Sequence, residues 1–125
     1  MQLTLISTAF FLATLITAVP NPIHQITVSV TNDLTGAHAS ATVPSDGLAR
    51  NLTSLFRGSA IDDHGAIVGT SAQLTQFTDR TRCFFQNYNH IIDLNGRGKT
   101  FVDLDGDKSK AVPVYLNGFN LQCPE

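Results

Sequence analysis

Three carboxylates at alternating positions form the pattern with the clearest capacity for chemistry in this chain. Asp103, Asp105 and Asp107 are separated by single residues, and oxygen ligands at this spacing can converge on a hard cation such as calcium. The segment is not an EF-hand, because Lys108 and Val114 occupy the positions that require glycine and a bidentate acid. The pattern therefore predicts either a calcium site or a polar hairpin tip whose charges neighbouring lysines balance.

The residues available for acid, base or nucleophilic catalysis do not form a recognisable set. Nine of the ten carboxylates are Asp, and the single Glu is the terminal Glu125, so the Glu base that some secreted ribonucleases pair with a His is missing. The four histidines stand alone, without the HxH or HExxH spacing that places two on one face of an element. Ser71 lies in Gly-Thr-Ser-Ala-Gln, which lacks the final glycine of a nucleophile elbow. We predict no catalytic residue, no zinc site and no cofactor.

A single N-glycosylation sequon is present, at Asn51-Leu52-Thr53. It borders the apolar positions of a predicted helix, so a glycan on Asn51 requires that side chain to face solvent. It also requires the chain to be exported. Asn51 is therefore a candidate modification site.

The N-terminal segment is a hydrophobic leader. The first charged side chain is Asp33, and residues 3–19 are mostly Leu, Ile, Phe, Ala and Thr. This run is shorter than the roughly 20 residues that a bilayer-spanning helix needs, and Pro20 follows it. We predict a signal peptide over residues 1–18 that is cleaved after Ala18. A membrane anchor or a buried strand are the alternatives that this composition leaves open.

The two cysteines, Cys83 and Cys123, are expected to pair, because export brings them into an oxidising compartment. The bridge would close a loop of about 40 residues and stabilise the fold by about 4 kcal/mol by constraining the unfolded chain. Two free thiols or an intermolecular bridge are the alternatives. The mature chain, residues 19–125, has the length of one secreted domain, which we expect to be a monomer without a membrane span.

Charge along the chain gives no sign of a nucleic-acid or membrane-surface partner. The sequence carries eight basic and ten acidic residues, for a net charge of −2. Half of the basic residues lie between positions 97 and 110, but four Asp residues between positions 93 and 107 offset them. The sequence therefore predicts no surface that binds polyanions.

Alternating apolar and polar residues predict a mainly β fold, either an antiparallel β-sandwich or a curled sheet. The segments 25–31 and 37–43 alternate on both sides of a turn, which is typical of a hairpin. Tight turns are expected at Asn95-Gly96 and Asp105-Gly106. Further strands are predicted at 66–70, 74–77, 83–94, 100–104 and 112–123.

One short helix is expected at about residues 46–57. The apolar residues Leu48, Leu52, Leu55 and Phe56 recur at helical spacing. Ser45 or Asp46 is the predicted cap for the first amide groups of this helix, and Gly58 the residue at its end.

A change of alternation is expected within the last predicted strand. Between residues 112 and 123 the apolar positions shift from even to odd numbers, and Asn117-Gly118 lies at the shift. Because side chains alternate strictly along a strand, this predicts a bulge or bend there. Cys123 would then face the core.

The leader, the opening segment 25–33 and the segments 71–75 and 100–104 together resemble the small secreted proteins of filamentous fungi, many of which are candidate effectors. The resemblance implies an extracellular protein and assigns no catalytic or binding residue. Unlike the cysteine-rich members, this chain has only one possible disulfide.

These observations favour a secreted, non-enzymatic protein that binds a protein or glycan outside the cell. Its partner would lie at a cell surface, in the wall, or on a host or competitor. A small secreted hydrolase would instead need Asp and His residues that only the fold brings together. A calcium-dependent surface protein is a third possibility and depends on the cluster at Asp103, Asp105 and Asp107.

Overall fold

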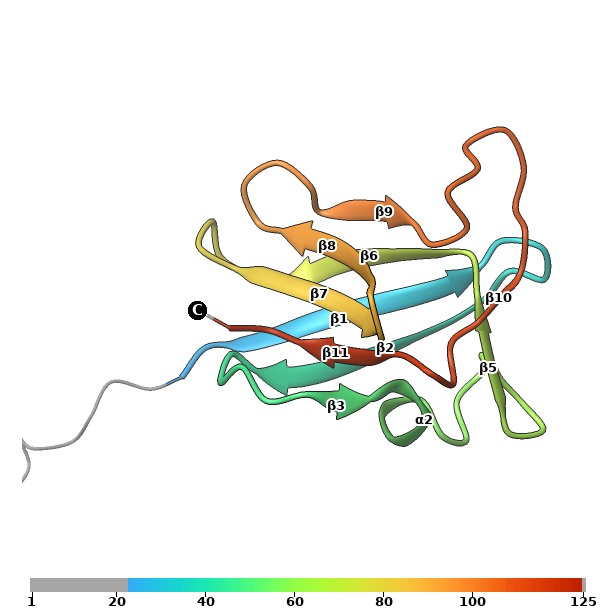
Figure 1. The fold of residues 1–125 in the computed structure, drawn as a ribbon, viewed down its shortest axis with the longest axis horizontal. Coiled ribbons are helices and arrows are strands. Elements are labelled where there is room, and N and C mark those ends of the chain that lie inside the picture. The colour runs from blue at the N-terminus through green and yellow to red at the C-terminus, as the bar shows by residue number, and fades with distance from the viewer. Residues whose placement is uncertain (1–22, 125) are drawn as a thin grey trace, which may run out of the picture.

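The computed structural model describes residues 23–124, which form antiparallel strands with a single short helix among them (Figure 1). The strands are β1 (Gln25–Asn32), β2 (Ala37–Pro44), β3 (Arg50–Asn51), β4 (Asp62–Asp63), β5 (Ala66–Gly69), β6 (Ser71–Gln76), β7 (Arg82–Asn87), β8 (His90–Asn95), β9 (Phe101–Asp103), β10 (Val114–Tyr115) and β11 (Asn120–Gln122), and the helix is α2 (Leu52–Leu55). The predicted signal peptide, residues 1–18, lies outside the described residues. In residues 23–124, no helix is both long and apolar enough to cross a membrane.

The hairpin of β1 and β2 confirms the alternation read from the N-terminal sequence. The register pairs Val28 with Ala41, and the apolar side chains of β1 are all buried. In the turn, the N–H of Gly36 donates to the carbonyl of Asn32 at 2.8 Å. Gly36 has a φ of +80°, a conformation that glycine adopts without steric cost.

One apolar core lies between two four-stranded sheets, ordered β2-β1-β6-β9 and β3-β11-β7-β8. Val30 and Leu74 contribute from the first sheet, and Phe85, Leu94 and Leu121 from the second, each almost completely buried. Figure 1 shows β7 and β11 lying across β1, with the chain passing between the sheets from β8 to β9. The predicted antiparallel β fold is confirmed. A third sheet, β10-β5-β4, was not predicted, and together with α2 it closes one end of the sandwich.

The predicted helix at 46–57 is wrong in length, because only Leu52–Leu55 is helical. The two residues before α2 form β3 and pair with β11. Leu48, which the helical spacing placed on the apolar face of the predicted helix, is 61% exposed. Pairing across the sheet satisfies backbone groups that an isolated first helical turn would leave unpaired, so tertiary contacts override the local pattern.

The predicted cap of the helix is also wrong. The N-cap residue is Asn51, whose extended backbone precedes the helix and whose side chain makes no capping hydrogen bond. Asp46 instead accepts the N–H of Leu48 at 3.0 Å, which forms a turn that directs the chain toward β3. Gly58 does follow the helix and has a φ of +75°.

Two of the predicted strands are each divided into two. The segment 83–94 forms the hairpin β7–β8, which reverses at Tyr88 with a φ of +54°. The segment 112–123 contains β10, which pairs with β5, and β11, which pairs with β7 and β3. The break expected at Asn117-Gly118 is confirmed as a tight turn, in which the N–H of Phe119 donates to the carbonyl of Leu116 at 3.0 Å.

The predicted disulfide between Cys83 and Cys123 is confirmed, with a Cα–Cα distance of 4.1 Å and no free cysteine in the chain. Cys83 lies in β7, and Cys123 directly follows β11, whose Gln122 pairs with Phe84. Both cysteines are buried in the core. The bridge therefore joins two neighbouring strands and holds the end of a strand only three residues long.

A bidentate ion pair joins Asp46 to Arg50, with nitrogen–oxygen distances of 2.9 and 2.8 Å. Hydrogen bonding to the Arg50 guanidinium, followed by the bond from the Leu48 amide, holds the pKa of Asp46 well below its usual range. A carboxyl whose pKa is lower in the folded chain stabilises the fold above its unfolded pKa, near pH 4. It loses this contribution as the pH falls through its folded pKa.

We expect Asp46→Asn to lower the thermal midpoint at neutral pH, and the difference from the wild type to shrink as the pH falls below about 4. Asparagine keeps an oxygen for the Leu48 amide, so the substitution isolates the ion pair. Thermal unfolding followed by circular dichroism across the acid range measures the difference. A difference that stays constant across this range would contradict the role given to the Asp46 carboxylate.

Candidate functional site

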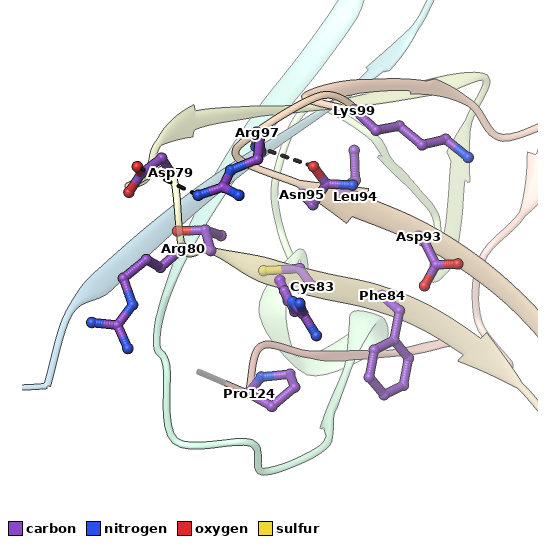
Figure 2. Close-up of a pocket in the computed structure, with 12 residues that line it drawn as sticks. Asp79, Arg80, Cys83, Phe84, Asp93, Leu94, Asn95, Arg97, Lys99 and Pro124 are labelled. Carbon is purple, nitrogen blue, oxygen red and sulfur yellow. Dashed lines mark hydrogen bonds and ion pairs between the residues drawn. The ribbon is translucent and has the colours of Figure 1, made fainter.

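A hollow of about 870 Å³ lies beside the disulfide, at the end of the sandwich opposite β5 and β10 (Figures 1 and 2). It is bounded by the β6–β7 turn, by the end of β8 with the turn that follows, and by the segment after β11. The lining residues are Asp79, Arg80, Thr81, Arg82, Cys83, Phe84, Asp93, Leu94, Asn95, Arg97, Lys99 and Pro124. We refer to this surface as the basic hollow.

Four of the eight Lys and Arg residues of the chain line the basic hollow, namely Arg80, Arg82, Arg97 and Lys99. Two carboxylates in the lining leave a local charge of +2, although the whole chain carries −2. Arg97 lies 4.0 Å from Asp79, and both side chains are mostly exposed, so this ion pair contributes little stability. Charges of one sign on a concave surface focus the electrostatic potential and attract ions of the opposite sign.

The pairing of β7 with β8 decides which side chains reach the basic hollow. Arg82 lies opposite Asn95, and Phe84 lies opposite Asp93. Because side chains alternate along a strand and Cys83 is buried in the core, Arg82 and Phe84 both point outward. Figure 2 shows Phe84 and Asp93 at one end of the hollow and Asp79, Arg80 and Arg97 at the other.

Hydrogen bonds hold the two turns in fixed positions next to each other. The Oδ1 of Asn95 accepts the N–H groups of Arg97 and Gly98, at 3.1 and 2.8 Å. The N–H of Gly96 donates to the carbonyl of Thr81 at 3.0 Å, which links the β8–β9 turn to the β6–β7 turn. The basic side chains of both turns are thereby attached to a bonded framework.

A second hollow of about 640 Å³ adjoins the first and is lined by Lys99, Phe101, Val102, Asp103, Gly106 and Lys108. Lys99 lines both hollows. Phe101 belongs to β9, the edge strand of its sheet, and is 51% exposed. An aromatic side chain flanked by two lysines is therefore open to solvent in this second hollow.

The predicted calcium ligands do not form a converging set. Asp103 ends β9, whereas the carboxylate of Asp105 accepts the N–H groups of Asp107 and Val112 at 2.9 and 2.7 Å. Asp107 accepts the hydroxyl and the N–H of Ser109, and these bonds lower its pKa. Among the described residues, no three His, Cys, Asp or Glu side chains are grouped to hold a metal ion. Two of the three carboxylates thus organise their own loop.

Asn51, the candidate glycosylation residue, is exposed and lies in β3. β3 is an edge strand of its sheet. The side chain therefore faces solvent, as a glycan would require, and glycosylation itself stays a prediction.

The Asp and His residues that a hydrolase would need do not meet in either hollow. Each hollow has Asp in its lining, but within the described chain neither lining includes a His. His64 contacts Asp63 at 2.8 Å, on the turn between β4 and β5, where both side chains are largely exposed. This pair lines neither hollow.

Summing charge along the sequence missed the basic hollow. The sum set Arg97 and Lys99 against carboxylates that include Asp105 and Asp107, yet neither of these two lines the hollow. Arg80 and Arg82, which precede Cys83 in the sequence, do line it. The one signal available in the sequence was the density of charge just before Cys83, with three charged residues between positions 79 and 82.

No protein-family model matches the chain, and searches of curated proteins and of solved structures each found no match. The function must therefore be inferred from the geometry of the chain itself.

Proposed function

We propose that this protein is an exported, non-enzymatic binding module whose basic hollow holds an anionic partner outside the cell. The observation that carries the proposal is the gathering of four basic side chains around one concavity in a chain of negative net charge. Such local concentration raises both the affinity for an anion and the rate at which it is encountered.

Two further features support the extracellular part of the proposal. The disulfide is of the kind that persists in oxidising compartments, and the N-terminal sequence has the composition of a signal peptide. Export would also make the exposed Asn51 side chain available for glycosylation.

The hydrogen-bonded framework supports a role in binding. Because a backbone hydrogen bond joins the two turns, the backbone that carries the basic side chains is already in place, and it needs less ordering when a ligand arrives. The exposed side chains themselves stay free to adjust to it. This arrangement favours recognition of an anion by charge and shape.

The test is retention of the oxidised protein on a polyanionic surface, such as dextran sulfate beads, at low and at physiological ionic strength. We expect retention that weakens as salt rises, because exposed charges are screened over about 10 Å at 0.1 M salt. Arg82→Ala/Arg97→Ala should reduce the affinity about tenfold or more, since both guanidinium groups line the basic hollow.

The matched control is Arg57→Ala/Lys110→Ala, which removes the same amount of positive charge from exposed residues that line neither hollow. This variant should keep most of the affinity. Equal losses in the two double variants would mean that net charge alone determines binding, and the hollow would then not be the site. No retention of the wild-type protein at low salt would overturn the proposal.

A further inference from the structure

The two hollows adjoin each other, because Lys99 lines both. The second hollow adds the half-exposed ring of Phe101 and the side chain of Lys108. We refer to the two hollows together as the strip. Each volume falls within the roughly 300–1,000 Å³ that is usual for ligand sites. A chain-like ligand could therefore contact cations in the first hollow and an aromatic face in the second.

Carboxylates are interleaved with these cations, which limits what kind of anion the strip suits. Asp79 and Asp93 line the basic hollow, and Asp103 lines the second hollow. A single-stranded DNA has no hydroxyl groups between its phosphates that could donate to these carboxylates, so the carboxylates would only repel it. A ligand with hydroxyl groups between its acidic groups would instead donate hydrogen bonds to the Asp oxygens, which are acceptors only.

Phe101 adds an apolar contact that a purely ionic partner would not use. Its ring belongs to the edge strand β9 and is 51% exposed. The face of an aromatic ring carries partial negative charge, so it suits the weakly positive C–H groups on one side of a sugar ring. Carboxylate, hydroxyl and C–H groups on successive units are together the chemistry of a uronic-acid chain.

We propose that the anionic partner is an acidic oligosaccharide that spans both hollows. Its carboxylates meet Arg82, Arg97 and Lys99, its hydroxyls donate to the interleaved Asp side chains, and one sugar ring stacks on Phe101. This inference rests on the proposed anion-binding function and names the class of ligand.

The experiment compares four probes on the oxidised protein: a short oligogalacturonate, the same oligosaccharide with its carboxyl groups reduced to neutral sugars, polyglutamate, and a single-stranded oligonucleotide. Affinities are measured by interferometry at one fixed ionic strength. We expect the oligogalacturonate to bind most tightly, and the reduced oligosaccharide to bind at least about tenfold more weakly because the charge contacts are lost.

Phe101→Ala separates this inference from the proposed function, because it leaves every charge in place. We expect it to weaken oligogalacturonate binding about tenfold, the size typical of an aromatic residue that contributes strongly to an interface, and to leave polyglutamate binding unchanged. The matched control is Tyr115→Ala, which removes an exposed aromatic side chain from β10, at the other end of the sandwich. It should alter neither affinity.

The possible outcomes distinguish the two proposals. If polyglutamate or the oligonucleotide binds as tightly as the oligogalacturonate, or if Phe101→Ala has no effect, the saccharide assignment is wrong while the anion-binding function stands. If none of the three anionic probes binds, both proposals are wrong. Thermal unfolding of each variant confirms that a loss of affinity is not a loss of fold.

Discussion

Replacing both cysteines, in Cys83→Ala/Cys123→Ala, is expected to lower the free energy of unfolding by about 4 kcal/mol. The two residues are separated by 40 positions in the sequence, so the bridge removes much of the conformational freedom of the unfolded chain. A domain of this size has a total stability of only about 5–15 kcal/mol. The variant should therefore unfold at a clearly lower urea concentration than the wild type.

The wild-type protein reduced with dithiothreitol is the control, because it keeps both sulfur atoms in the core and lacks only the covalent bond. We expect it to match the alanine variant to within about 1 kcal/mol, the difference being the packing lost with the sulfurs. Reduction should also loosen Pro124, which follows Cys123 and lines the basic hollow, and so weaken polyanion retention. Unfolding midpoints that are the same for oxidised and reduced protein would show that the bridge does not stabilise the fold.

Replacing Gly96 by alanine is expected to destabilise the fold by about 3 kcal/mol, toward the upper end of what overpacking usually costs. An added Cβ would overlap the carbonyl oxygen of Thr78 and come within 2.9 Å of the Phe77 ring. A backbone carbonyl cannot rotate away as a side chain can, so the two turns would have to separate. Their separation would strain the hydrogen bond from the N–H of Gly96 to the carbonyl of Thr81.

The same turn offers a matched control in Gly98→Ala. An added Cβ at Gly98 meets nothing within 4 Å, so this variant should unfold within about 0.5 kcal/mol of the wild type. Urea denaturation measures both variants, and retention on dextran sulfate beads should fall only for Gly96→Ala, because separating the turns displaces Arg80 and Arg97. Similar stabilities for the two variants would show that close contact between the turns is not needed.

Patterns that depend on a few neighbouring residues were predicted well. The β1–β2 hairpin follows from alternation on either side of a turn, and the strands β8 and β9 each lead into a turn, at Asn95-Gly96 and at Asp105-Gly106. The break at Asn117-Gly118 follows from the shift in alternation. In each case the conformation is decided by backbone sterics and by the strict alternation of side chains along a strand.

The errors arose where two distant segments compete for the same backbone groups. Leu48 fits the helical spacing predicted for residues 46–57, but pairing with β11 drew the chain around Arg50 into β3. A local pattern records what a segment can do alone and carries no information about its neighbours in space.

The sequence by itself determined the β class and, through a count of two cysteines, the only intramolecular disulfide that could form. Only the tertiary structure decided which charged side chains lie close together. The register of β7 against β8 and the contact between two turns place Arg82 near Arg97, while Asp105 and Asp107 lie outside the lining of the hollow. The physical reason is that disulfide pairing follows from residue identity when only two cysteines exist, whereas electrostatic potential depends on distances that strand order and register set.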